Sequence, residues 1–182
     1  PMVLWIIVIA VSVLIDQITK IIAAGNMALY ESVPLIKGFF SFTYIHNYGA
    51  AWGIFSEHRW IFIVITGIAI IVLPIILYRF RKLHFLFGFS MSLIIGGAIG
   101  NMIDRLFRGY VIDFLEFTFI DFPVFNVADI CVTVGTVLMF IYIVFIDKTL
   151  FADKKAPKPE EATGEEVLPN DGNHQKSDTD DK

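Results

Sequence analysis

Four long apolar segments constrain what this 182-residue chain can fold into more than any other feature of its sequence. They cover residues 2–24, 60–78, 85–103 and 130–146. A helix needs about 20 mostly apolar residues to cross the hydrocarbon core of a bilayer, which is about 30 Å thick. Each segment is close to that length. We therefore expect an all-α membrane protein with four transmembrane helices.

The composition supports this expectation and excludes several other classes of protein. Hydrophobic residues make up 56% of the chain and charged residues 18%, against about 45–50% and about 25% in soluble domains. No basic stripe is present to bind nucleic acid. The first apolar segment lacks a basic stretch before it, and Asp16 and Lys20 stand where a cleavage region should be small and neutral, so we expect a transmembrane helix there rather than a cleavable signal peptide.

The distribution of Lys and Arg predicts the orientation, because cytoplasmic loops carry an excess of these residues. Residues 79–82 and 147–158 hold seven of them, whereas residues 25–59 and 104–129 hold four. We therefore expect both termini in the cytoplasm and the two longer loops at the outer face. In the first of these loops, alternating aromatic and β-branched residues over 39–45 predict a strand at the membrane surface.

The chain divides into a membrane domain, residues 1–150, and a polar tail, residues 151–182. Residues 147–182 contain ten acidic residues and six lysines, and this excess equals the net charge of −4 of the whole chain. The tail has three prolines and no apolar periodicity, so we expect a disordered acidic cytoplasmic segment.

Several ionisable or polar residues in or beside the spans need an explanation, because such groups are costly in a membrane. Asp16 and Lys20 lie four residues apart and share one helix face, as an intrahelical ion pair or as support for a nearby site. Asn101, Asp104 and Arg105 form a polar face at the end of the third span. Asp104 fits an ordinary boundary charge, whereas Asn101 lies among apolar neighbours and needs a partner.

Asp113 and Asp129 are the most informative acidic residues. A folded loop between them would let the two carboxylates face each other, whereas the alternative is a helix-capping role for Asp129 and a solvated Asp113. Spacing alone leaves both open. The four histidines have no metal-ligand spacing, so we expect no metal site. Among catalytic chemistries, a carboxylate pair is the one that the sequence still allows.

Five segments carry a family resemblance: DQITK at 16–20, NYGAAWG at 47–53, GGAIGNMIDR at 96–105, VIDF at 111–114 and FNVAD at 125–129. In this order they resemble the bacterial lipoprotein signal peptidases, also called signal peptidase II, which are four-span aspartic proteases. The resemblance implies an extracytoplasmic β-cradle, a small outer helix near the active site and a bacterial cell membrane location.

The resemblance also implies a reaction and its residues. The substrate would be a prolipoprotein whose cysteine already carries diacylglycerol, cut just before that cysteine. No cofactor is implied, and globomycin-type cyclic peptides would inhibit. The catalytic pair falls on Asp113 and Asp129. Supporting or substrate-binding roles fall on seven residues: Asn47, Asn101, Arg105, Asn126, Asp16, Lys20 and Trp52.

Alternatives remain at two points. A four-span transporter would use Asp16 as an intramembrane cation site, although the informative acids gather at one face and no internal repeat is evident. A non-catalytic membrane scaffold would explain the hydropathy but not the two loop aspartates. Trp52 lies among small residues in an outer loop, as an interfacial anchor or as part of a segment that closes over substrate.

The tail generates the first prediction. Truncation after Lys155 should leave membrane insertion and the expected peptidase activity unchanged, since the removed segment has no apolar face to dock. Comparing kcat/KM of the truncated and full-length proteins measures this. A clear loss of activity at unchanged thermal stability would contradict it.

Overall fold

The computed structural model describes residues 2–49 and 59–147, and it contains four long apolar helices. They are α1 (Met2–Asn26), α2 (Arg59–Arg79), α3 (Phe85–Phe107) and α4 (Val127–Ile141), which continues into the π-helical segment η3 (Tyr142–Ile146). All four are long and apolar enough to cross a membrane. The predicted four-helix membrane fold is confirmed.

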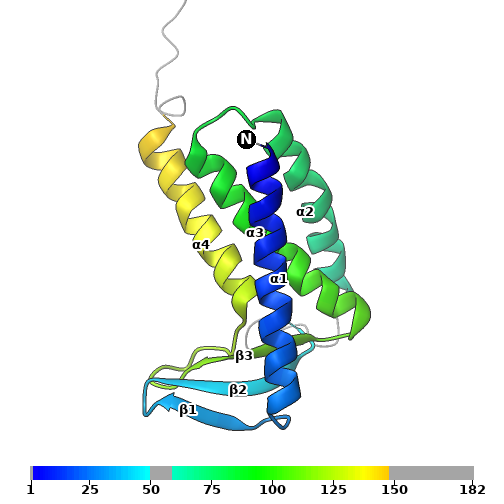
Figure 1. Ribbon diagram of the computed structural model, residues 1–182, viewed down its shortest axis with the longest axis vertical. Coiled ribbons are helices and arrows are strands. Elements are labelled where there is room, and N and C mark those ends of the chain that lie inside the picture. The colour runs from blue at the N-terminus through cyan, green and yellow to red at the C-terminus, as the bar shows by residue number, and fades with distance from the viewer. Residues whose placement is uncertain (1, 50–58, 148–182) are drawn as a thin grey trace, which may run out of the picture. The chain divides into compact units, whose positions relative to one another are not determined.

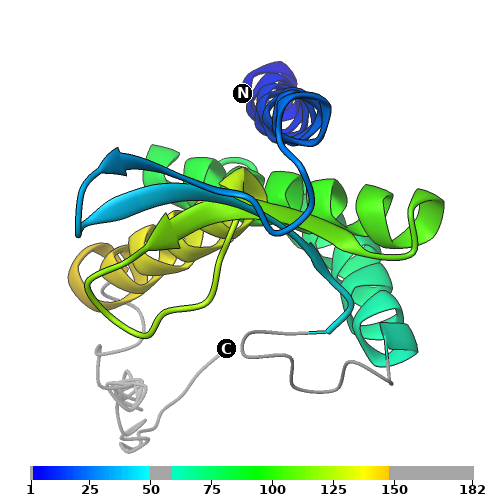
Figure 2. The same ribbon diagram turned by 90° about the horizontal axis from the view of Figure 1, so that it is seen from below.

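A three-stranded antiparallel sheet lies across one end of the helices (Figure 1). It consists of β1 (Ser32–Ile36), β2 (Phe40–Asn47) and β3 (Val111–Phe117), in that order. Seen from below, the sheet runs beneath the ends of the helices as a narrow platform (Figure 2). The strand predicted over 39–45 is β2, and the sheet as a whole matches the small cradle that the family resemblance implies.

Helix α3 is the centre of the bundle, since it packs against α1, α2 and α4. Small residues make the close approaches possible. A side chain at Gly96 would come within 2.7 Å of the Cβ of Ser12 on α1, and one at Gly97 would collide with the carbonyl oxygen of Ala128 on α4. The small-residue surface expected on the third span therefore holds two helices against it.

Two apolar clusters fix the frame around this contact. One joins α1, α2, α3 and η3 through Trp5, Leu77, Phe87, Met91, Ile95 and Tyr142. The other attaches the sheet to the end of α1 through Ala23, Tyr44, Ile112 and Phe114. The second cluster positions β2 and β3, and with them the polar residues that these strands carry.

The helix ends differ from the predicted boundaries in one respect that matters for function. Helix α3 continues to Phe107 instead of ending at residue 103, so Asp104 and Arg105 lie inside its last turns, as their predicted polar helix face with Asn101 requires. Helix α4 begins at Val127 instead of residue 130. Trp52 and the predicted tail lie outside the described residues, and no separate short helix is found within 2–49 and 59–147.

The packing of α3 generates a prediction about stability. Gly97→Ala should lower the free energy of unfolding by about 1–3 kcal/mol, because its Cβ would press on the backbone of α4. Gly67→Ala on α2 is the matched control, since its Cβ would meet only the end of Met102 at 3.7 Å. Thermal unfolding in detergent measures both. Equal melting temperatures for the two variants would contradict the prediction.

Candidate active site

Helix α4 begins with a reciprocal cap that fixes one of the two aspartates. The side chain of Asn126 accepts a hydrogen bond from the backbone N–H of Asp129 at 3.0 Å, and Asp129 Oδ2 accepts one from the backbone N–H of Asn126 at 3.1 Å. Two otherwise unpaired N–H groups of the helix end are thereby satisfied. Asp129 thus takes part in capping, as the alternative interpretation expected, but its second oxygen remains available to other partners.

The other aspartate, Asp113, lies in β3 and is 1% exposed. Its Oδ2 accepts a hydrogen bond from Asn47 Nδ2 of β2 at 2.8 Å, and its Oδ1 accepts one from Asn126 Nδ2 at 2.6 Å. The alternative of a solvated Asp113 is therefore wrong. The loop between β3 and α4 folds back, as the facing-carboxylate interpretation requires.

Two amides link the carboxylates of Asp113 and Asp129. Asn101 Nδ2 donates to Asp129 Oδ1 at 2.8 Å, and Asn126 Nδ2 donates both to Asp113 and, at 3.1 Å, to Asn101 Oδ1. Four residues from α3, β3 and the start of α4 thus form one hydrogen-bonded group. The side chain of Asn101, which was expected to need a polar partner among its apolar sequence neighbours, is hydrogen-bonded to Asp129 and Asn126.

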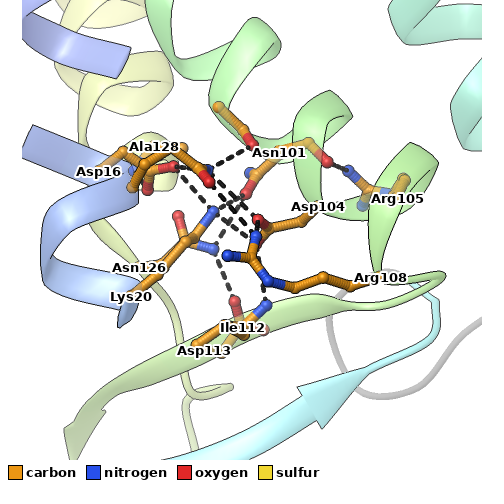
Figure 3. A network of polar contacts seen from close by, with 12 residues as sticks. Asp16, Lys20, Asn101, Asp104, Arg105, Arg108, Ile112, Asp113, Asn126 and Ala128 are labelled. Carbon is orange, nitrogen blue, oxygen red and sulfur yellow. Dashed lines mark hydrogen bonds and ion pairs between the residues drawn. The ribbon is translucent and has the colours of Figure 1, made fainter. Parts of the chain in front are cut away.

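The ammonium of Lys20 contacts this group through Asn101 (Figure 3). Its Nζ lies 2.9 Å from Asp16 Oδ2, 3.0 Å from Asp104 Oδ2 and 2.8 Å from Asn101 Oδ1. An ammonium has three N–H donors, so these acceptors satisfy it fully. Lys20, Asp16 and Asp104 are all 0% exposed. The predicted ion pair between Asp16 and Lys20 exists, and it also supports the site.

The two buried carboxylates around Lys20 each hold a backbone segment. Asp16 Oδ1 accepts a hydrogen bond from the N–H of Ala128 at 2.9 Å, and Asp104 Oδ2 accepts one from Ile112 N–H at 3.1 Å. Ala128 precedes Asp129, and Ile112 precedes Asp113. The supporting carboxylates therefore fix the chain directly beside each aspartate of the pair.

The interpretation of Asp104 as an ordinary boundary charge is wrong, because its carboxylate pairs with both Lys20 and Arg108. Arg108 also donates to Gln17 Oε1 at 3.3 Å, and Gln17 Nε2 donates to Asp104 Oδ1 at 3.2 Å. Asp16 and Asp104 are thus balanced by two cations. Sequence reasoning missed Gln17 and Arg108, although the four-residue spacing from Asp104 to Arg108 was a signal.

Two apolar cavities meet at Asp129. One of about 380 Å³ lies between the sheet and α4, and one of about 350 Å³ lies among α2, α3 and α4. Arg105 lines the second cavity with Asn101, and its guanidinium lies 5.5 Å from the ring centre of Phe62. Arg105 makes a 3.3 Å hydrogen bond to the carbonyl of Asn101. Its positive charge therefore lies beside the cavity and not in direct contact with the carboxylate of Asp113 or Asp129.

Burial, and after it the neighbouring Asp129 carboxylate, raise the pKa of Asp113 to about 7 against the lowering effect of the hydrogen bonds from Asn47 and Asn126. Two interacting carboxyl groups of this kind share one proton over a neutral pH range. No cluster of metal-ligating side chains occurs among the residues that the structure describes. The arrangement suits acid–base chemistry on a water molecule.

Known proteins resemble this chain over most of its length. The family model described as signal peptidase (SPase) II matches residues 8–145. The lipoprotein signal peptidase of Symbiobacterium thermophilum is 44% identical over 140 residues, which are 76% of this chain and 92% of that protein. The lipoprotein signal peptidase of Clostridium acetobutylicum is 42% identical over 156 residues, 84% of this chain and 98% of that protein.

Two solved structures also resemble this chain over most of its length. One described as a bacterial membrane enzyme at 2.3 Å resolution superimposes with a TM-score of 0.71 and 36% identity, covering 85% of this chain and 94% of its own. A second, at 1.9 Å, gives a TM-score of 0.69 at 37% identity, with 78% and 93% covered.

The buried charges generate a prediction about stability. Lys20→Met should lower the free energy of unfolding by about 3–5 kcal/mol, because it leaves two buried carboxylates without their shared cation. Lys37→Met, the same change at an exposed position, should have no effect. Melting temperatures measured side by side test this. A Lys20→Met protein as stable as Lys37→Met would show that the ammonium is not needed.

Proposed function

Because the chain belongs to the signal peptidase II family, we propose that Asp113 and Asp129 are the catalytic pair of a lipoprotein signal peptidase. The protein is a multi-pass membrane aspartic endopeptidase that removes signal peptides from prolipoproteins. The observation that carries the assignment of the pair is its linkage through Asn126. The Asn126 side-chain amide donates to the carboxylate of Asp113 and its backbone N–H donates to that of Asp129, while Asp113 is buried with a pKa of about 7.

In the proposed mechanism the pair carries one proton. The ionised carboxylate removes a proton from a water molecule, which attacks the carbonyl carbon of the scissile peptide bond. The protonated carboxyl transfers its proton to the carbonyl oxygen, so a neutral gem-diol forms and the two carboxyl groups have exchanged protonation states. The newly protonated carboxyl then gives its proton to the leaving nitrogen while the other carboxylate takes one from a gem-diol hydroxyl, so the C–N bond breaks and the pair returns to its starting state. The pair titrates as a unit, and each aspartate serves in one of the two protonation states.

The remaining predicted residues have positioning roles in this proposal. Asn47, Asn101 and Asn126 orient the carboxylates through the hydrogen bonds described above. Asp16 and Lys20 hold the start of α4 and the amide of Asn101. Arg105 lines the 350 Å³ cavity and supplies positive charge for the negative charge that develops on the substrate.

The apolar cavities beside Asp129 support a lipid-modified substrate. We propose cleavage just before a diacylglyceryl-modified cysteine, with the acyl chains in hydrocarbon and the peptide bond at the carboxylates. The protein would lie in the bacterial plasma membrane with cytoplasmic termini and an outer active site, and globomycin-type cyclic peptides would compete with substrate. An intramembrane cation site at Asp16 gains no support, because both of its oxygens hold other groups.

The catalytic assignment predicts that Asp113→Asn and Asp129→Asn each lower cleavage of a diacylglyceryl-modified prolipoprotein by at least about 100-fold, since each carboxyl is needed for proton transfer. Both proteins should remain folded. Glu116→Gln is the matched control, because it removes a carboxylate from the same strand as Asp113 but contacts Thr43 instead. Near-normal turnover by either aspartate variant, measured with purified protein, would exclude that residue from the pair.

The pH profile provides a separate prediction. Activity should fall as the pH rises through about 7, because the pair then loses its shared proton. Asn47→Ala removes a hydrogen bond that lowers the pKa of Asp113, so this alkaline decline should move to higher pH. Asn26→Ala, at the exposed end of α1, is the control. A decline in kcat/KM at the same pH in all three proteins would contradict the prediction.

A further inference from the structure

Large apolar side chains remain exposed at one end of the three-stranded sheet. They come from the end of β1, the turn after it and the loop after β3. Their exposed fractions lie between 43% and 60%, and we call them the aromatic edge: Leu35, Ile36, Phe39, Phe119, Ile120 and Phe122. A contiguous exposed apolar surface of this kind marks an interaction site in a folded protein.

Ring contacts and a backbone hydrogen bond join the turn after β1 to the segment that ends β3 and follows it. The rings of Phe39 and Phe119 stack with centres 4.7 Å apart and planes within 1°. Phe117 lies edge-on to Phe39 at 6.3 Å and to Phe122 at 6.0 Å. A backbone hydrogen bond of 3.0 Å from Thr118 to Phe39 fixes the same junction. The exposed rings are therefore presented as one preorganised surface.

The aromatic edge continues the lipid-facing surface of a membrane helix. The sheet crosses the end of the helices, and the turn between β1 and β2 lies on the α4 side (Figures 1 and 2). Between the sheet and α4, the 380 Å³ cavity is lined by rings such as Phe122 and by Ile130 and Val134 of α4, which are 40% and 42% exposed. Since α4 spans the membrane, its exposed apolar residues face acyl chains.

We propose that the aromatic edge is immersed in the bilayer leaflet at the sheet end of the helices, where it contacts lipid acyl chains. Apolar faces of interfacial elements enter this region by about 5–10 Å. Lys37 and Asp121 are exposed beside the edge and limit the depth, because their charges stay at the level of the headgroups. The immersion does not depend on the catalytic assignment, but it would place the mouth of the cavity at Asp129 in hydrocarbon.

Depth-dependent fluorescence quenching tests this proposal in the full chain. Cys131→Ser removes the native cysteine, and single cysteines at Ile120 or, separately, Phe119 carry an environment-sensitive fluorophore. Val137→Cys, on a 53% exposed site of α4, is the hydrocarbon control, and Glu31→Cys, at the exposed start of β1, is the aqueous control. The proteins are placed in phosphatidylcholine–phosphatidylglycerol vesicles with nitroxide-labelled lipid or with aqueous iodide.

Immersion predicts that nitroxide lipid quenches both edge labels at least about twofold more than the Glu31 label, approaching the Val137 label, while iodide quenches them less. Two outcomes would overturn the proposal. Edge labels that respond to iodide like the Glu31 label would lie in water. Edge labels protected from both quenchers would be covered by protein, such as a second copy of the chain. Agreement between the two labelled sites excludes a local effect of breaking the Phe39–Phe119 stack.

Discussion

The ammonium of Lys20 is the interaction on which the rest of the site depends. It neutralises Asp16 and Asp104, two fully buried carboxylates on different helices, and it also binds the amide of Asn101. Such a cluster is stable only when each charge is paired and each donor is satisfied. Each of the two carboxylates in turn accepts a hydrogen bond from a backbone N–H next to one aspartate of the proposed catalytic pair. The packing of α1 against α3 thereby fixes the positions of Asp113 and Asp129.

The balance of charges separates the supporting groups from the reacting ones. Lys20 and Arg108 form ion pairs with Asp16 and Asp104. The proposed catalytic pair is different: among the described residues, Asp113 accepts its side-chain hydrogen bonds from the neutral amides of Asn47 and Asn126, and its burial beside Asp129 raises its pKa. A buried pair without a directly contacting cation keeps a proton near neutral pH. The fold thus joins the ion-paired carboxylates and the buried Asp113 in one hydrogen-bonded network.

Local sequence patterns predicted the helices, the strand β2 and the grouping of polar motifs, because hydropathy and alternation are properties of neighbouring residues. They did not predict β1, whose residues are all exposed, or the burial of Asp104. The roles of Gln17 and Arg108 were also missed, since their contacts join residues 91 positions apart. Spacing left the relation of Asp113 to Asp129 open, and only the fold of the intervening chain decides it. The catalytic assignment itself came from the family resemblance and remains a proposal.

The protonation state of Asp113 tests the central claim most directly. Infrared spectroscopy of the carboxylic-acid C=O stretch, with isotope-labelled aspartate, counts protonated side chains as the pH is changed. A shared proton predicts a carboxylic-acid band that is present at pH values below about 7, disappears as the pH rises through that value, and is absent from Asp113→Asn. A wild-type spectrum in which this band disappears in the range of ordinary aspartates, about pH 4, would contradict the proton-sharing pair.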